Sequence, residues 1–345
     1  MDEEPPLDTA LSSVPTDSTD VLPPDEDHSR ILVVDDDPLI RKILTDQLTE
    51  AGYRVSTAGD GAEALAKVAE DPPDLILLDI ILPKLDGFEV CRRLKSDEQT
   101  ILIPVVMVTG LTATRDRIRG IEAGADDFLS KPFNPQELVT RVRSLLRLKR
   151  HTDELEHAET VLFTLALSVE AKDPYTKDHC NRLARTSLAL GKALGLPPHQ
   201  LKALSRGGVL HDLGKIATPE AILLKPGPLI EGERVVIQKH PIVGERICSP
   251  LRSLRLVLPI LRHHHERWDG SGYPDGLAGE DIPLTARILQ VVDIYDALVT
   301  ERPYKPAFSH ERACAILREQ TARGWRDPRL VEALIDLIRS GRMRT

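Results

Sequence analysis

Aromatic residues are scarce in this chain, because Phe, Trp and Tyr together make up 3% of its 345 residues. Its cores must therefore be built from aliphatic side chains. No apolar run reaches the roughly 18 to 20 residues that a membrane-spanning helix needs, and no signal-like apolar segment opens the sequence. The four cysteines form neither a CxxC pair nor a disulfide framework. These absences predict a cytoplasmic protein without a membrane span.

An excess of basic residues is lacking as well. The net charge is −9, and residues 1–28 contain nine acidic residues and no Lys or Arg. The other 45 acidic residues balance the 45 Lys and Arg of the chain, so the sequence carries no overall basic footprint for DNA. Because residues 1–28 also show no apolar periodicity, we expect them to form a disordered acidic tail.

Between residues 29 and 148, short apolar runs alternate with segments of helical spacing. The expected strands are RILVVDD, YRVSTA, DLILLDI, IPVVMVTG and DDFLSKP, and two of the intervening helices are expected near 87–95 and 114–123. Five such β–α units predict a doubly wound, five-stranded parallel sheet of the flavodoxin-like kind, with helices on both faces.

Beyond this sheet domain the chain stays helical. An apolar residue recurs every seven positions, at Leu148, Leu155, Leu162 and Val169. This spacing is typical of a coiled coil that pairs two copies, although Thr152 and Glu159 between them are polar. The alternative is one amphipathic helix packed on its own domain. We therefore predict a helical connector at 149–170 and an all-α domain at 160–345.

The expected strand ends carry a cluster of polar side chains: Asp35, Asp36, Asp37, Asp79, Thr109 and Lys131. Ligands of doubly wound sheets bind beyond the carboxyl ends of the strands, and an oxygen-rich site of this kind suits Mg²⁺. Asp37 has a separate role, because it precedes Pro38 and a helical segment and is expected to cap that helix.

At these residues the segment resembles the receiver domain of two-component response regulators, in the blocks VVDDDP, LLDIILPKLDGFE, VTG and SKPF. The resemblance covers about 120 residues. It implies that Asp79 accepts a phosphoryl group from a histidine kinase. It also implies that Asp36, Asp79 and the Ile81 carbonyl ligate Mg²⁺, while Asp35 acts through water.

The same resemblance assigns the remaining receiver residues. Thr109 would hydrogen-bond the phosphoryl oxygens, Lys131 would pair with them, and Phe128 would be the aromatic switch residue. A carboxylate attacks phosphorus only when the accumulating negative charge is offset, which a divalent ion and an ammonium group achieve. We also expect a cis peptide bond between Lys131 and Pro132.

The second half of the chain contains a set of histidines and aspartates in apolar surroundings. His211 and Asp212 follow the apolar stretch GGVL, and Asp293 follows ILQVV. A carboxylate in such a place must be paired, neutralised or bound to a metal. Buried histidines often only donate to a carbonyl, but five imidazoles and two carboxylates could fill two adjacent metal sites that share one carboxylate. Fe, Mn, Zn or Ni suits such ligands.

The triplet of histidines at 263–265 can be divided by helical geometry, with about 100° of rotation per residue. A polar face is formed by Arg252, Arg255, Arg262 and Glu266. His264 then points almost opposite that face and is the preferred ligand, and His265 is the second. His263 is expected to be a helper or a packed side chain. Glu266 is expected to be a surface partner of Arg262.

These residues are similar to the HD-GYP family of hydrolases, in the blocks HDLGK, HHERWDGSGYPDGL and ARILQVVDIYDALVTERPYK. The resemblance covers roughly residues 160–340. It implies hydrolysis of cyclic di-GMP to pGpG, with further cleavage to GMP left open. It implies that Asp212 bridges two metals, and it gives the ligands as His179, His211, Asp212, His240, His264, His265 and Asp293.

The family resemblance also implies how substrate and partners are held. Lys215 would face the scissile phosphate, and Arg302 and Lys305 would contact the substrate. A loop would dock diguanylate cyclase domains through Gly272, Tyr273 and Pro274. Some family members bind a third metal through a glutamate four residues before the first histidine. Here Tyr175 occupies that place, so we expect two divalent metals, Fe, Mn or similar.

Together these features predict a homodimeric response regulator in which phosphorylation of Asp79 acts on a cyclic di-GMP phosphodiesterase. One alternative is a scaffold that senses cyclic di-GMP or docks partners without hydrolysis. A DNA-binding regulator would need a helix-turn-helix and a basic face, and neither is found. A third alternative is another phosphohydrolase chemistry of the HD group. The complete set of seven ligands together with Lys215 favours the phosphodiesterase.

Overall fold

The structure is a computed structural model that describes residues 29–110, 114–172, 178–225, 227–301 and 306–341. The chain divides into two compact units, Met1–Asp153 and Glu154–Thr345, and each is described by itself. The acidic tail predicted at residues 1–28 lies outside the described part.

Among the described residues, no helix is both long and apolar enough to cross a bilayer.

The first unit is built on one parallel sheet in the order β2-β1-β3-β4-β5. Its strands are β1 (Arg30–Val34), β2 (Arg54–Ala58), β3 (Leu75–Asp79), β4 (Val105–Thr109) and β5 (Asp127–Ser130). Every residue of β3 and β4 is buried, as expected for a sheet covered on both faces. The predicted doubly wound fold is confirmed, and the strand order reverses between β1 and β3, where the candidate receiver residues lie.

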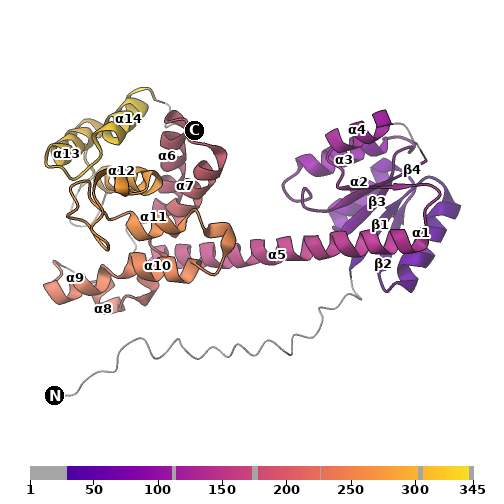
Figure 1. Ribbon diagram of the computed structural model, residues 1–345, viewed down its shortest axis with the longest axis horizontal. Coiled ribbons are helices and arrows are strands. Elements are labelled where there is room, and N and C mark those ends of the chain that lie inside the picture. The colour runs from indigo at the N-terminus through magenta and orange to yellow at the C-terminus, as the bar shows by residue number, and fades with distance from the viewer. Residues whose placement is uncertain (1–28, 111–113, 173–177, 226, 302–305, 342–345) are drawn as a thin grey trace, which may run out of the picture. The chain divides into compact units, whose positions relative to one another are not determined.

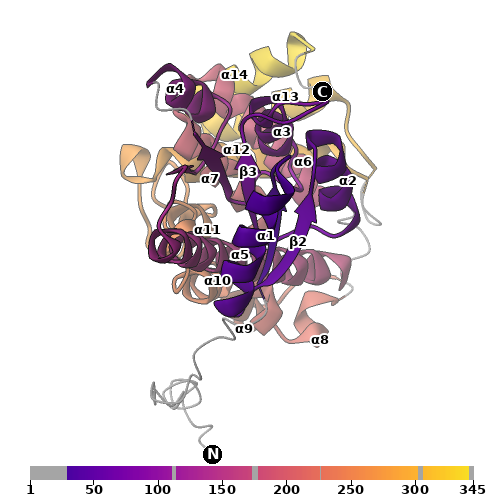
Figure 2. The same cartoon turned by 90° about the vertical axis from the view of Figure 1, so that its right-hand side faces the viewer.

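Five helices cover the two faces of this sheet (Figure 1 and Figure 2). They are α1 (Pro38–Glu50), α2 (Gly61–Glu70), α3 (Gly87–Ser96), α4 (Thr114–Glu122) and α5 (Pro135–Lys172). One aliphatic core joins the sheet to α1 and the first turns of α5, and a second joins it to α2, α3 and the end of α4. As predicted, Asp37 caps α1, because its side chain accepts a hydrogen bond from the amide of Leu39 at 2.8 Å.

Helix α5 contains all four residues of the seven-residue apolar repeat. Leu148 and Leu155 are 64% and 48% exposed, whereas Val169 is 8% exposed and Leu162 packs against the core of the second unit. The later half of the repeat therefore packs on its own unit, as in the alternative to the coiled coil. Of the four repeat residues, Leu148 and Leu155 are the two that remain exposed to a partner.

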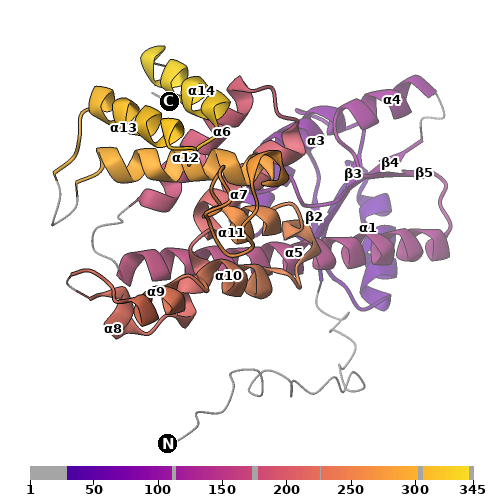
Figure 3. The same ribbon diagram turned by 60° about the vertical axis from the view of Figure 1, so that its left-hand side comes forward.

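The second unit is helical in its described part. Its helices are α6 (His179–Ala193), α7 (Pro198–Leu210), α8 (Glu220–Leu223), α9 (Glu231–Ile237), α10 (His240–Cys248), α11 (Leu258–His263), α12 (Leu284–Val299), α13 (His310–Ala322) and α14 (Pro328–Arg339). Figure 3 shows α12 with α13 and α14 on one side and α11 on the other. Residues of α6, α7, α11, α12, α13 and α14 share one core, built almost entirely from aliphatic side chains.

Helices α6 and α7 approach each other closely at Gly208. A β-carbon at that position would lie 2.6 Å from the backbone nitrogen of Ala184 and 2.7 Å from its α-carbon. Backbone atoms cannot yield as a flexible side chain can, so the closeness of this crossing depends on glycine. The crossing places the end of α7, with His211, next to α6, with His179.

We predict that Gly208→Ala lowers the free energy of unfolding by about 1–3 kcal/mol, the usual cost of inserting a methyl group into a filled contact. Urea denaturation followed by circular dichroism measures the change. Gly232→Ala in α9 is the matched control, because a β-carbon there meets no atom within 4 Å. Equal unfolding midpoints for the two variants would contradict this account of the crossing.

Candidate functional site

The sequence-predicted receiver residues meet at the carboxyl ends of β1, β3, β4 and β5. The ammonium nitrogen of Lys131 lies 2.6 Å from Asp35 Oδ2 and 2.7 Å from Asp79 Oδ2. Oxygens of Asp35, Asp36 and Asp79 come within 4.8 Å of one another, so the three can share one ion. Thr109 is buried at the end of β4. The backbone amide of Ile81 donates to Asp79 Oδ1 at 3.3 Å.

The charges of this cluster suit a cation. Burial raises the pKa of Asp35, against the hydrogen bond from Lys131. Burial would lower the pKa of Lys131, but its hydrogen bonds to Asp35 and Asp79 outweigh that effect and raise the pKa. One ammonium group therefore faces three carboxylates. The excess of negative charge and the set of oxygen donors fit a divalent ion such as Mg²⁺.

The ring of Phe128 packs against α4 at Gly120. A β-carbon on Gly120 would come within 2.5 Å of the Phe128 ring, and the Arg117 guanidinium lies 5.6 Å from the ring centre. The ring is half-buried against the second core of the first unit. The peptide bond between Lys131 and Pro132 is cis, as predicted.

In the second unit, the seven predicted metal ligands come from separate helix ends and one helix interior. His179 begins α6, His211 and Asp212 follow α7, His240 begins α10, His264 and His265 follow α11, and Asp293 lies in α12. They gather in two clusters, one of His179, His211 and Asp293 and the other of Asp212, His240, His264 and His265. Within each cluster the potential ligand atoms lie within 4.8 Å of one another.

Asp212 joins the two clusters. Its Oδ2 lies 3.3 Å from His211 Nε2, in one cluster, and its Oδ1 lies 3.3 Å from His240 Nε2, in the other. The two oxygens of a single carboxylate therefore face different histidines. This is the arrangement that a carboxylate bridging two ions requires.

Three of the histidines are oriented by the same local contact. Nδ1 of each ring donates to the carbonyl oxygen three residues earlier, which for His211 is Gly208 at 3.0 Å, for His240 Ile237 at 2.7 Å and for His264 Leu261 at 2.9 Å. Each acceptor lies in the last turn of a helix, where carbonyl groups lack an intrahelical partner. A carbonyl can only accept, so Nδ1 carries the proton and Nε2 presents a lone pair to the site.

The resulting lone pairs need a cation. Nε2 of His240 and Nε2 of His264 lie 3.3 Å apart in a buried place. Burial lowers the pKa of both rings, to about 4 for His240, so neither ring offers a proton to the other. Asp212 Oδ1 is also buried and accepts no hydrogen bond from the described residues. Two facing acceptors beside an unsatisfied carboxylate oxygen fit a bound metal ion and suit little else.

His179 has a carboxylate behind it in place of a carbonyl. Its Nδ1 lies 2.7 Å from Asp296 Oδ2, and Asp296 also receives two hydrogen bonds from Arg182. His179 Nε2 lies 3.4 Å from Asp293 Oδ1. Burial alone would lower the pKa of His179, but Asp293 and Asp296 raise it to about 9. Sequence reasoning missed Asp296, although its position three residues after Asp293 places both on one face of α12.

The structure corrects the expectation for Glu266. Its side chain is fully buried, and its Oε1 accepts from the amides of Asp275 at 2.7 Å and Gly276 at 3.1 Å. Arg262 pairs with Glu245 and Asp275 instead. The helical-wheel argument failed because α11 ends at His263, so Glu266 lies in a turn. Glu266 holds the following loop, and His263 lies outside the two clusters, 3.4 Å from Asp275 Oδ2.

The loop of Gly272, Tyr273 and Pro274, to which the family resemblance assigns partner docking, is half-buried. The Tyr273 ring stacks on His265 with 4.8 Å between ring centres. Gly272 lets the loop pack closely against the backbone that follows His265, because a β-carbon at Gly272 would lie 2.3 Å from the backbone nitrogen of Arg267. Tyr273 therefore forms part of the wall of the site.

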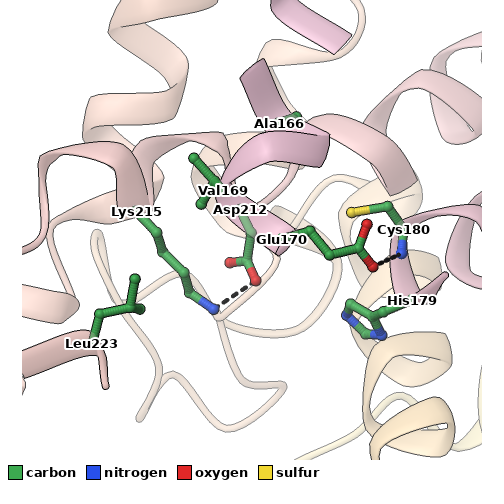
Figure 4. A pocket seen from close by; sticks show the side chains of 8 residues that line it. All are labelled: Ala166, Val169, Glu170, His179, Cys180, Asp212, Lys215 and Leu223. Atoms are coloured by element: carbon green, nitrogen blue, oxygen red, sulfur yellow. Dashed lines mark hydrogen bonds and ion pairs between the residues drawn. The ribbon is translucent and has the colours of Figure 1, made fainter. Parts of the chain in front are cut away.

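A small cavity of about 40 Å³ opens beside the ligands (Figure 4). It is lined by Ala166, Val169, Glu170, His179, Cys180, Asp212, Lys215 and Leu223. The ammonium group of Lys215 lies 2.6 Å from Asp212 Oδ2. Burial alone would raise the pKa of Asp212, but the charges of Lys215 and His211 outweigh burial and bring the pKa well below its usual range. Of the other predicted residues, Arg302, Lys305 and Tyr175 lie outside the described residues.

Comparisons with known proteins match both units. Residues 31–143 match the model of the response regulator receiver domain, and residues 164–330 match an HD domain. The chain is 36% identical to the cyclic di-GMP phosphodiesterase response regulator RpfG of Xanthomonas campestris pv. campestris, over 88% of this chain and 86% of that protein. It is 32% identical to a cyclic di-GMP phosphodiesterase of Thermotoga maritima, over 89% of this chain and 90% of that protein.

We predict that metal binding releases about one proton from His179 near neutral pH. A metal ligand must be the neutral imidazole, whereas a pKa of about 9 keeps His179 protonated in the metal-free protein. Titration of metal-depleted protein with Mn²⁺ near pH 7.5, in two buffers of different ionisation enthalpy, measures the release. The release should fade as the pH rises above about 9. Heats that are independent of the buffer at both pH values would refute the prediction.

Proposed function

This chain belongs to the response regulators that join an N-terminal receiver domain to a C-terminal HD domain, and from that premise we propose that it hydrolyses cyclic di-GMP under the control of receiver phosphorylation. The observation that carries the proposal is the pair of ligand clusters that share Asp212. Its relatives named cyclic di-GMP phosphodiesterase are matched over most of their length. We propose two ions, Fe, Mn or similar, held by the seven ligands.

Two divalent ions held here would supply the Lewis acid for cleaving a phosphodiester. Asp212 sets the spacing of the two clusters, because each of its oxygens faces a different histidine. Lys215 lines the cavity beside Asp212 and can donate to a phosphoryl oxygen as negative charge accumulates there. A water oxygen would form the new bond to phosphorus and the 3′ sugar oxygen would leave with a proton. This gives linear pGpG, and a second cleavage would give GMP.

The wall of the site is suited to a nucleotide. Tyr273 presents a ring that is held by stacking on His265, and an aromatic face beside a phosphate-binding centre can stack on a base. We assign substrate contacts to Lys215 and, on the family resemblance, to Arg302 and Lys305. The same resemblance suggests that the loop of Gly272, Tyr273 and Pro274 meets diguanylate cyclase domains. Because Tyr273 is half-buried, such docking would use the edge of the loop.

In the receiver unit we propose Asp79 as the acceptor of a phosphoryl group from a histidine kinase. Mg²⁺ held by Asp36, Asp79 and the Ile81 carbonyl, with Asp35 acting through water, would offset the charge. Lys131 already contacts Asp79 at 2.7 Å, and Thr109 at the end of β4 would bind a phosphoryl oxygen.

Phosphorylation would act on the second unit through α5. We propose that the receiver repacks around Phe128 and that α5 then changes the relation between two catalytic units of a homodimer. Leu148 and Leu155, which are exposed on α5, are the proposed contact between the copies. The later residues of the repeat are already used within the second unit.

The hydrolytic function predicts that His211→Ala lowers turnover of cyclic di-GMP at least about 100-fold, because a ligand next to the shared carboxylate is removed. Chromatographic analysis of the products on metal-loaded protein measures the rate. His199→Ala is the control, since His199 is an exposed histidine of α7. Equal rates for His211→Ala and the wild type would favour the alternative of a scaffold that binds cyclic di-GMP without hydrolysis.

The regulatory part predicts that Asp79→Asn abolishes the effect of a small-molecule phosphodonor on the turnover rate, in whichever direction that effect runs in the wild type. The amide cannot accept the phosphoryl group. Asp46→Asn, at an exposed position of α1, should respond like the wild type. A phosphodonor effect that survives in Asp79→Asn would exclude Asp79 as the acceptor.

A further inference from the structure

The last turn of α5 brings a carboxylate to the metal site. Glu170 is half-buried and lines the same cavity as His179, Asp212 and Lys215 (Figure 4). It comes from the helix that begins at Pro135 in the first unit, whereas the proposed ligands come from later elements of the second unit. None of the roles assigned above uses this residue.

Glu170 replaces a missing helix cap. Helix α6 begins at His179, and the residue at its cap position, Asp178, has a left-handed backbone (φ 60°) and makes no capping hydrogen bond with its side chain. The first amides of a helix need acceptors from outside the helix. Glu170 Oε1 provides one, because it accepts from the amide of Cys180 at 3.0 Å. Its negative charge is also favourable at a helix N-terminus.

His179 is thereby held from two sides. Its ring is fixed through Nδ1 by Asp296 of α12 at 2.7 Å, and its backbone is fixed by the contact of Glu170 with the next residue, Cys180. The first contact sets the direction of the ring, and the second sets the position of the end of the helix. A proposed ligand of the metal site therefore depends on the last turn of α5.

On the basis of the proposed function, we propose that Glu170 is a positioning residue, which ties the last turn of α5 to the first turn of α6 and so links the connector helix to the ligand His179. The link is short. A displacement of α5 by the rise of one residue, about 1.5 Å, would carry the carboxylate beyond hydrogen-bond range of Cys180. A signal that moves α5 would therefore reach His179 through this contact.

The test compares Mn²⁺ affinity, measured calorimetrically without substrate, in full-length variants of Glu170. Glu170→Gln keeps an oxygen that can accept from Cys180, so its affinity should stay within about threefold of the wild type. Glu170→Ala removes the acceptor and should weaken one of the two ions about tenfold, the usual effect of losing a group that supports a metal ligand. Glu156→Ala, at an exposed position of the same helix, is the control and should match the wild type.

The outcomes separate this role from general stability. Wild-type affinity in Glu170→Ala would overturn the proposal, and so would equal losses in Glu170→Gln and Glu170→Ala. If Glu170→Ala does not fold, as judged by its melting curve, Glu170→Asp takes its place, because the shorter side chain retracts the acceptor while keeping the charge. Wild-type affinity in Glu170→Asp would then overturn the proposal.

A second readout is the ratio of turnover with and without phosphodonor. We expect this ratio to differ from one in the wild type and in Glu170→Gln, and to approach one in Glu170→Ala. An unchanged ratio in Glu170→Ala, or a ratio of one in the wild type, would overturn the link to α5. If no protein turns over cyclic di-GMP, the proposed function fails, and the Mn²⁺ affinities alone decide whether Glu170 positions His179.

Discussion

The shared carboxylate of Asp212 is the constraint on which the second unit depends. Its two oxygens face His211, which follows α7, and His240, which begins α10, so the end of α7 must lie beside the start of α10. The tight crossing of α6 and α7 at Gly208 likewise brings His179 close to His211. Uncompensated, a carboxylate amid apolar helices would destabilise the fold. The side chain of Lys215 and the surrounding imidazoles lower the pKa of Asp212. The facing lone pairs of His240 Nε2 and His264 Nε2 beside it suit a divalent cation.

The two sites solve one electrostatic problem in similar ways. In the receiver unit, Lys131 contacts Asp35 and Asp79 at 2.6–2.7 Å; in the second unit, Lys215 contacts Asp212 at 2.6 Å. Lys131 faces three carboxylates and so leaves a net negative charge for a metal, whereas Lys215 offsets the charge of Asp212 alone and leaves Asp293 and the imidazoles as further donors. Each also lies where phosphoryl chemistry is proposed, so the same ammonium group that stabilises the folded site can stabilise negative charge that develops on a phosphate.

The sequence predicted well the elements that follow a periodic pattern, and incompletely the side-chain contacts that form where separate helices meet. The alternation of apolar runs was enough for the doubly wound sheet, and Asp37 before Pro38 was enough for the cap of α1. The prediction that the Glu266 side chain lies on the surface was wrong, because it assumed that the helix continues to Glu266, whereas α11 ends at His263. Asp296 and Glu170 were missed because their partners, His179 and Cys180, come from other helices; a lone acid in an apolar helix shows that a partner is needed but not which one.

The proposed hydrolysis of cyclic di-GMP would need two ions, held by the two ligand clusters that Asp212 joins. The most direct test is to titrate metal-depleted protein with Mn²⁺ under anaerobic conditions while measuring bound metal and product together. Turnover should stay low while each chain binds one ion, rise as the second ion binds, and reach its maximum when both are bound. Full turnover with one ion bound, or none with two, would contradict the proposal.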